Sequence, residues 1–192
     1  MTRKVALFVA LVSVGVLSGC GGLKFMRPAR PGEELKSPPS GMALVNFLRP
    51  TGWGGGDLFE VFEGEKLIGT TKGKTRFQVV CSPGEHVFHA KAEKVTVVQA
   101  QLLADKIYDV VVDVAMGMWR ANIKLAPITK AEPRRNEVAE WEARSSLYVL
   151  DPTQNIEAFE SKRRADNQEI LKDFLSGEKQ DRVQKLGPDD HR

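Results

Sequence analysis

Between residues 42 and 125, apolar residues recur at every second position in short runs, and residues that favour turns separate these runs. Along 108–114, apolar residues alternate with positions that include Asp109 and Asp113, which is the pattern of a half-buried strand. Seven or eight such strands in about 85 residues predict a mainly β fold, an antiparallel β-sandwich. The predicted strands are 43–48, 58–62, 66–70, 76–81, 86–92, 95–102, 106–115 and 119–125.

The first predicted strand is apolar on both of its faces. Val45 and Phe47 lie on one face, and Leu44 and Leu48 lie on the other. A sheet that is open to water on one side should show a clean alternation of apolar and polar residues. We therefore expect another segment of the chain to cover the outer face of this strand.

The C-terminal part of the chain is highly charged, with both signs mixed, and its spacing favours helices. Asn136 predicts the start of a short helix. Asp151 followed by Pro152 predicts the start of a longer one, because aspartate caps helices and proline fits the first turn. Gly177 suits the end of this helix. The segment 145–150 favours either a helix or a strand.

The predicted long helix has apolar ends and a polar middle. Ile156 and Phe159 begin an apolar stripe, and Ile170 and Phe174 resume it, whereas 161–169 is nearly all polar. We expect this helix to cover the outer face of the first strand through Ile156 and Phe159.

The N-terminus has the layout of an export signal. Arg3 and Lys4 precede an almost purely apolar run over 5–17, which is too short to span a bilayer of about 30 Å. The following residues resemble a bacterial lipobox, in which the cysteine is acylated and becomes the new N-terminus: Leu17, Ser18, Gly19 and Cys20. By resemblance to lipoprotein sorting patterns, Gly21 after the cysteine implies the outer membrane, facing the periplasm, if the cell is Gram-negative.

These patterns divide the chain into four segments. The stretch after the cysteine is rich in glycine and proline and predicts a flexible tether. The segments are a signal peptide over 1–19, the lipidated cysteine with its tether over 20–40, the sandwich over 41–128, and a helical extension with a disordered tail over 129–192.

The predicted sandwich is similar to an uncharacterised bacterial lipoprotein family with a PEGA-like, immunoglobulin-like β-sandwich. The similarity covers roughly residues 41–128, and its motifs are turn and core positions that imply a fold and no specific activity. Glu63 departs from the family pattern, which commonly has asparagine before the hairpin glycine. The segments that carry the resemblance are Ala43–Pro50, Val61–Gly69, Ser82–His86 and Met116–Gly117.

The cysteine count restricts the covalent chemistry. Cys20 and Cys81 are the two cysteines of the chain. With Cys20 acylated, Cys81 has no partner in the same chain, so we exclude a disulfide-based fold and a cysteine-based metal site. Cys81 shares a strand face with Phe77 and Val79 and is therefore expected to be a buried, inert thiol, although pairing with another chain stays open.

Charge and spacing argue against nucleic-acid binding and catalysis. The net charge is +3, of which Arg3 and Lys4 contribute two, so the mature chain carries +1. His86 and His89 are three apart in a strand and face opposite sides, so they cannot chelate one ion together. Asp109 and Asp113 are about 13 Å apart along their strand, too far for a carboxylate pair, and are expected on a solvated face. We expect no metal, no cofactor and no enzyme activity.

Apolar residues in two predicted loops are candidates for a contact patch, because binding residues gather in the loops at the ends of sandwiches. The alternative is that they cap the core. The four residues are Trp53, Met116, Met118 and Trp119.

The sequence thus predicts a non-enzymatic envelope lipoprotein. Its expected partners are the lipid membrane, through acylated Cys20, and an envelope protein or the cell wall. A second reading is a small-ligand-binding lipoprotein with its ligand between one end of the sandwich and the C-terminal helix.

Overall fold

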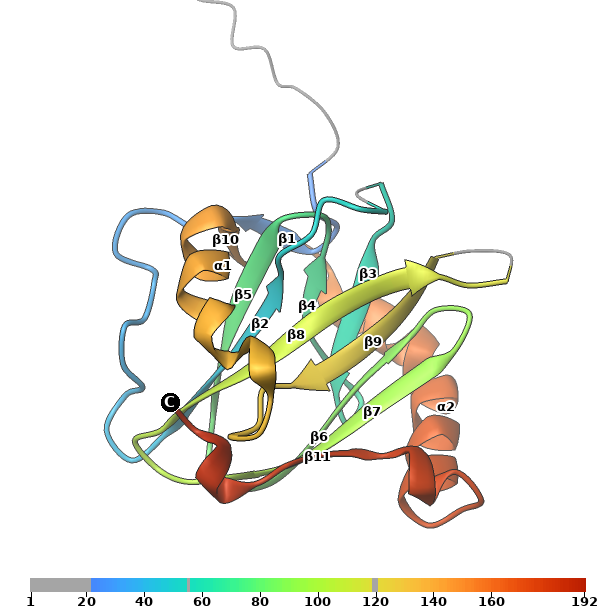
Figure 1. Cartoon of the computed structure of the whole chain (residues 1–192). Helices are drawn as coiled ribbons and strands as arrows, with labels where there is room; N and C mark the ends of the chain where they lie inside the picture. The colour runs from blue at the N-terminus through green and yellow to red at the C-terminus, as the bar shows by residue number, and fades with distance from the viewer. Residues whose placement is uncertain (1–21, 55, 119–120) are drawn as a thin grey trace, which may run out of the picture.

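A computed structural model of the chain describes residues 22–54, 56–118 and 121–192, in which two β-sheets pack face to face with helices on their outer surfaces (Figure 1). The strands are β1 (Met26–Pro28), β2 (Ala43–Arg49), β3 (Phe59–Glu63), β4 (Lys66–Thr71), β5 (Thr75–Cys81), β6 (Gly84–Lys91), β7 (Val95–Leu102), β8 (Ile107–Met116), β9 (Ala121–Pro127), β10 (Ser146–Leu150) and β11 (Gln184–Leu186). The α-helices are α1 (Val138–Arg144) and α2 (Ile156–Leu175), and the short 3₁₀ helices are η1 (Pro133–Glu137), η2 (Gln180–Arg182) and η3 (Pro188–Asp190).

Sheet A has the strand order β1-β10-β5-β2-β8-β9, and sheet B has the order β11-β7-β6-β3-β4. The prediction of a mainly β fold with a C-terminal helix is confirmed. The prediction of a purely antiparallel sandwich of seven or eight strands is wrong, because both sheets are mixed and the described residues form eleven strands. The parallel pairs are β2 with β8, β10 with β5 and β11 with β7. Two of these three pairs add a strand from the C-terminal extension to a strand of the sandwich.

The core between the sheets is built from the inward-facing side chains of both. Phe47 stacks on Phe77 with ring centroids 4.8 Å apart, and the edge of Phe88 meets Phe47 at 5.3 Å. Such aromatic contacts contribute beyond simple burial. Gly69 lies so close to the Phe77 ring that a Cβ there would be 2.7 Å from ring carbons, so this strand position has no room for a side chain.

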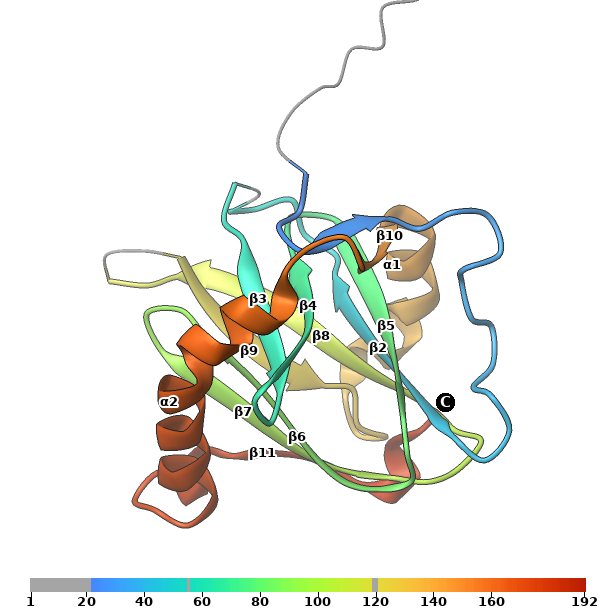
Figure 2. The ribbon, with the colours of Figure 1, turned by 180° about the vertical axis from the view of Figure 1, so that it is seen from behind.

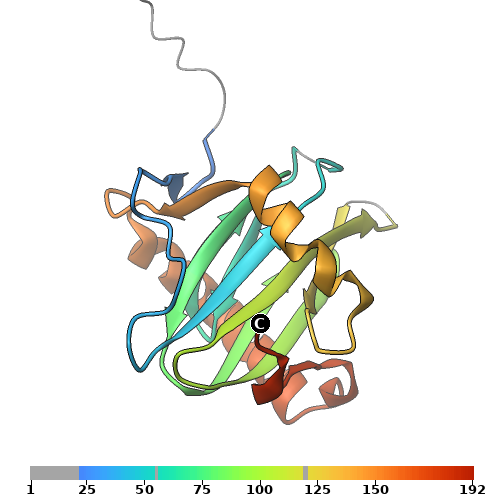
Figure 3. The same ribbon diagram turned by 60° about the vertical axis from the view of Figure 1, so that its left-hand side comes forward.

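The outer face of sheet A is covered by α1, as Figure 3 shows. Leu48 and Val111 pack with Val138 of α1, and Trp141 lies against the same cluster. The prediction that the first strand is covered on both faces is confirmed, since every residue of β2 is buried. The prediction that Ile156 and Phe159 provide the cover is wrong, because the short helix α1 reaches this face first along the chain.

A chain of polar side chains also crosses the outer face of sheet A. Gln78 Nε2 donates to Asn46 Oδ1 (2.9 Å), and Asn46 Nδ2 donates to Asp109 Oδ1 (3.0 Å). Arg192 Nε donates to Asp109 Oδ2 (2.6 Å), and its NH1 group donates to Glu142 (3.1 Å). The predictions of a disordered tail and of a solvated Asp109 are therefore wrong: the last residue of the chain neutralises a carboxylate that is 3% exposed. Asp109 tolerates burial because it is paired.

Helix α2 crosses the outer face of sheet B (Figure 2). It begins at Ile156 with Asn155 as its N-cap, whose side chain accepts a hydrogen bond from Ala158 N (3.0 Å). The predicted cap, Asp151, instead accepts hydrogen bonds from Thr153 in the turn before the helix. The helix is followed by Gly177, in agreement with the predicted end.

The segment that was predicted to be a flexible tether is folded against the domain from Leu23 onward. Leu23 and Phe25 are buried, and β1 pairs with β10. Farther along, Leu35 N donates to Gln78 Oε1 (2.9 Å) on the outer face of sheet A. The prediction of a tether over 21–40 is wrong for these residues. Apolar side chains that stand alone among glycines and prolines, such as Leu23 and Phe25, pack against the domain and are buried there. Residues 1–21, including the lipobox and Cys20, lie outside the described residues.

Replacing Arg192 with alanine should lower the free energy of unfolding by about 1–3 kcal/mol, because the variant leaves the buried carboxylate of Asp109 without its cation. Urea denaturation of the purified protein measures this change. Lys130→Ala is the matched control, since the Lys130–Asp189 pair spans 4.0 Å and is exposed on both sides. The control should change stability by less than about 0.5 kcal/mol. Equal losses in both variants would contradict a special role for the Arg192 pair.

Candidate functional site

A groove of about 860 Å³ lies between α2 and sheet B and extends past the edge of the sheet, since its lining includes Phe59 and Ala92 from the core side and Ala121 of β9. Its volume is in the range of small-ligand sites, about 300–1,000 Å³. Phe62 of β3 and His89 of β6 line it from the sheet, and Arg163, Asp166 and Asn167 line it from the helix. Alternation places Phe62 and His89 on the outer face of sheet B, away from the core between the sheets.

The groove exists because the middle of α2 is polar. At its first turn, Ile156 and Phe159 pack with Phe62 and its neighbours, and near its end Ile170 and Phe174 pack on the valines of β6 and β7. Between these contacts, the sheet-facing positions carry polar residues that make no apolar contact with the sheet. The polar stretch that the sequence showed over 161–169 therefore lines a cavity.

His89, which lines the groove, has one buried ring nitrogen without a hydrogen-bond partner. Its ring stacks on Phe62, and its Nε2 lies 2.8 Å from the carbonyl oxygen of Gly64. A carbonyl can only accept, so Nε2 carries the hydrogen. Burial lowers the pKa of His89, with a smaller opposing effect of the Gly64 hydrogen bond, so the ring is neutral at pH 7. Its Nδ1 is consequently a bare acceptor, and it is buried without a hydrogen-bond partner.

Asn167, which lines the same groove, has a buried amide nitrogen without a hydrogen-bond partner. The residue is 3% exposed, and its Nδ2 makes no hydrogen bond. Leaving a buried donor or acceptor unpaired costs about 1–3 kcal/mol, so native proteins rarely tolerate it without a reason. Two such atoms of opposite type in one groove match a ligand group that accepts from Asn167 and donates to His89.

Charged residues surround these two atoms with both signs. Asp166 is 3.8 Å from Lys91 and 3.7 Å from Arg163, and the Arg163 guanidinium also lies over the Phe159 ring at 5.5 Å. These pairs are exposed and contribute little to stability. The groove is lined by two basic residues, Lys91 and Arg163, and by four acidic ones, so its lining is net negative and disfavours an anionic ligand. The acidic residues are Asp57, Glu60, Glu93 and Asp166.

A separate group of side chains could hold a metal ion. Among the described residues, Glu63, Cys81 and His86 place ligand atoms within 4.8 Å of one another. The sequence argument excluded a cysteine-based site by counting cysteines, and it did not consider one thiol joined by a histidine and a carboxylate from other strands. The prediction that the two histidines face opposite sides agrees with the structure: His86 stacks on Phe88 of the core, whereas His89 stacks on Phe62.

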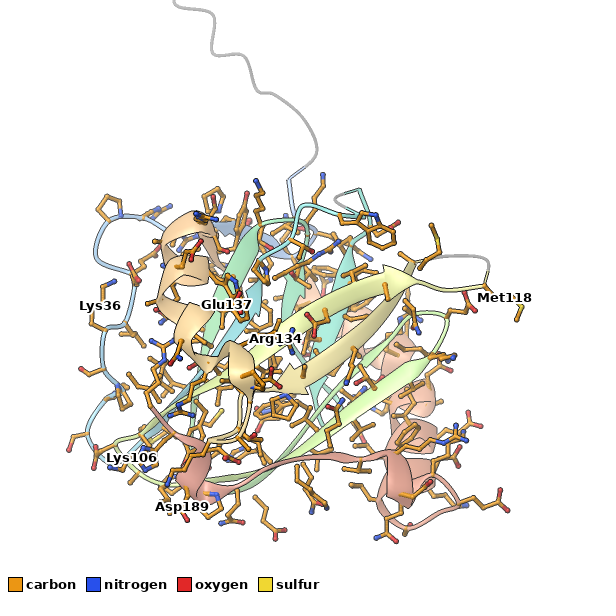
Figure 4. The ribbon with its side chains drawn as sticks, in the orientation of Figure 1. Lys36, Lys106, Met118, Arg134, Glu137 and Asp189 are labelled. Carbon is orange, nitrogen blue, oxygen red and sulfur yellow. The ribbon has the colours of Figure 1, made fainter. Side chains whose placement is uncertain are left out.

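The predicted contact patch is described only in part. Trp53 is 48% exposed, Met116 76% and Met118 80%. Met118 projects from the tip of the β8–β9 hairpin, as Figure 4 shows. Gly54 lies against Val114 of β8, so the loop that carries Trp53 and the hairpin lie at the same end of sheet A. Trp119 lies outside the described residues.

Arg49 holds the loop that carries Trp53, a role that the sequence did not reveal. Its guanidinium is fully buried and donates to the backbone carbonyls of Gly54 (2.7 Å) and Asp57 (2.8 Å). Sequence reasoning also missed His89 and Asn167. For Asn167 a signal was present, because it occupies a helix position whose neighbours at three and seven residues farther along, Ile170 and Phe174, are both buried and apolar.

Replacing Asn167 with leucine should raise the free energy of unfolding of the ligand-free protein by about 1 kcal/mol, because the variant removes an unpaired buried donor. Urea denaturation measures the change. Glu169→Leu introduces the same side chain at an exposed position of the same helix and should leave stability nearly unchanged. A loss of stability in Asn167→Leu would mean that the amide has a structural partner.

Comparison of the chain with protein-family models, with curated proteins and with solved structures finds no match in any of the three. The resemblance to a lipoprotein family with a PEGA-like sandwich therefore stays a prediction.

Proposed function

We propose that the protein is a lipid-anchored lipoprotein of the cell envelope that binds, without catalysing a reaction, a small polar ligand in the groove between α2 and sheet B. The observation that carries the proposal is that two residues lining the same cavity, His89 and Asn167, each have a buried side-chain nitrogen without a hydrogen-bond partner, Nδ1 and Nδ2 respectively. A group that donates and accepts at one point, such as a sugar hydroxyl or a peptide amide, satisfies both.

The cell wall is a source of such ligands in the envelope, because its fragments carry both sugar hydroxyls and peptide amides. The groove has apolar walls from Leu58, Phe59 and Ala92 beside its polar atoms. Pockets of this composition bind small molecules by burying their apolar surface and orienting them with a few hydrogen bonds. A sugar ring or a short peptide presents both kinds of surface.

Membrane anchoring is supported by the sequence and by the start of the folded domain. Leu23 is 6% exposed, and the three Cα-to-Cα steps from Cys20 to Leu23 reach at most about 11 Å. An acylated Cys20 would hold the domain close to the membrane surface. In the described residues, no helix has both the length and the apolar composition that crossing a membrane requires. We propose the outer membrane, facing the periplasm, as the location in a Gram-negative cell.

A second candidate function is docking of an envelope protein at the exposed methionines. Met116 and Met118 are among the most exposed apolar side chains of the described residues, and methionine adapts to many partner surfaces. The patch borders the groove, because Ala121, the strand partner of Met116, lines it, and Glu93, another lining residue, accepts a hydrogen bond from Met118 N (3.0 Å).

Binding of soluble cell-wall fragments to the full-length protein in detergent tests the groove. Isothermal titration should show saturable binding that weakens about tenfold or more in Asn167→Leu and in His89→Phe, because each variant removes one of the two hydrogen bonds. Glu169→Leu is the control and should bind like the unaltered protein. Binding that is absent, or equal in all four proteins, would refute the groove as the site for this class of ligand.

Cys20→Ala should release the protein from membranes or leave the signal peptide uncut, because the acyl chains attach to this cysteine. Each buried methylene contributes about 0.8 kcal/mol, and stable anchoring needs more than one chain. Membrane fractionation with mass spectrometry of the purified protein measures both outcomes. Cys81→Ala replaces the other cysteine and should stay attached. A processed Cys20→Ala protein that remains on the membrane would contradict the proposal.

A further inference from the structure

Glu63, Cys81 and His86 meet where the two sheets come together at one end of the sandwich. Cys81 is the last residue of β5 in sheet A, Glu63 is the last residue of β3 in sheet B, and His86 lies near the start of β6. The turn from Cys81 to Gly84 joins the sheets here. The side chains of Cys81 and His86 are largely buried, whereas Glu63 is 30% exposed and gives the cluster an opening to solvent.

The hydrogen bonds of His86 leave two acceptors facing each other. Nε2 lies 2.8 Å from the carbonyl oxygen of Ser82, which can only accept, so Nε2 carries a hydrogen. The other ring nitrogen, Nδ1, contacts a carboxylate oxygen of Glu63. In a neutral ring, Nδ1 has a lone pair that points at the lone pairs of the carboxylate. The contact therefore requires a proton between the two atoms. A metal ion that takes the place of this proton must move the two side chains apart, because two ligand atoms of one zinc-like ion lie about 3.3 Å from each other.

The sulfur of Cys81 distinguishes these two species. A shared proton bridges only Nδ1 and the carboxylate, and Cys81 is then only a buried side chain of the core. A divalent ion uses all three atoms. Burial, together with the charge of Glu63, raises the pKa of the Cys81 thiol to about 12, so the sulfur is protonated until a metal replaces its hydrogen.

We propose that Glu63, Cys81 and His86 form a binding site for a divalent transition metal of the zinc class. Sulfur, imidazole and carboxylate are the ligands that Zn²⁺ takes, and a thiolate with an imidazole disfavours Mg²⁺ and Ca²⁺. The hydrogen bond from Nε2 to Ser82 is the outer contact that typically orients a metal-binding histidine. On binding, the S–H bond of Cys81 breaks, a sulfur–metal bond forms, and the proton leaves to solvent; no oxidation or reduction occurs.

This site is independent of the groove. Alternation along β6 places His86 toward the core and His89 toward α2, and the metal-site residues include none of the atoms assigned to the ligand. The site also differs from the lipid attachment, because it uses Cys81 and leaves Cys20 free for acylation.

Titration of the full-length protein in detergent with Co²⁺, after treatment with a chelator, tests the site. Cobalt is a spectroscopic substitute for zinc, and a thiolate ligand adds a charge-transfer band in the near ultraviolet. We expect one equivalent of Co²⁺ to bind with this band and Zn²⁺ to displace it. Failure to bind, or binding without the band, would overturn the proposal and leave His86 and Glu63 as an ion pair.

Variants identify the ligands. Cys81→Ala should abolish the charge-transfer band, and Glu63→Gln should weaken Co²⁺ binding about tenfold or more, because each removes one ligand. Glu63 is partly exposed, so its variant tests the site even if Cys81→Ala does not fold. His191→Ala removes a histidine outside the cluster and should bind Co²⁺ like the unaltered protein. A band that persists in Cys81→Ala, or unchanged affinity in Glu63→Gln, would refute the assignment.

Discussion

The structure depends on covering the outer faces of two sheets that carry apolar side chains on both sides. Every residue of β2 is buried, and Val97 of sheet B is fully buried on the face beneath α2. An antiparallel sandwich normally exposes a polar outer face to water. Here the C-terminal extension covers both outer faces, with α1 on sheet A and α2 on sheet B, and it adds β10 and β11 to the sheets. The extension is therefore part of the domain and not an appendage.

Helix α2 packs against sheet B through apolar side chains at its two ends, and the groove lies beside its polar middle. Ile170 and Phe174 are buried and contribute about 1.5–3 kcal/mol each, whereas Ile156 and Phe159 are partly buried and contribute less. The unpaired atoms in the groove cost about 1–3 kcal/mol each. Four apolar contacts outweigh two unpaired atoms, so the helix stays in place while its middle keeps a polar cavity. This balance is what a binding site on a small domain requires.

The strands β3 and β6 contribute to two sites of different chemistry. Because side chains alternate between the faces of a strand, His86 and His89 lie on opposite sides of sheet B. His89 contributes a hydrogen-bonding atom to the groove, and His86 joins Glu63 and Cys81 beside the core. One short segment thus presents two histidines to two environments, and the environment, not the residue type, decides what each can bind.

The sequence by itself determined the eight strands β2–β9, since period-two alternation is a local property that each run displays without reference to its neighbours. It showed neither β1 nor β11, and it left β10 open between helix and strand, because these short strands form only by pairing with a strand of the sandwich. The polar middle of α2 was also visible in the sequence, but the sequence did not show that this stretch lines a cavity. Only the tertiary structure decided which strands pair in parallel, which helix covers β2, and that Arg192 reaches Asp109 across 83 residues of sequence. The groove and the cluster around Cys81 are likewise formed only by the tertiary structure. Alternation reports which side of a strand is buried, whereas the partner on that side is fixed by packing of the whole chain.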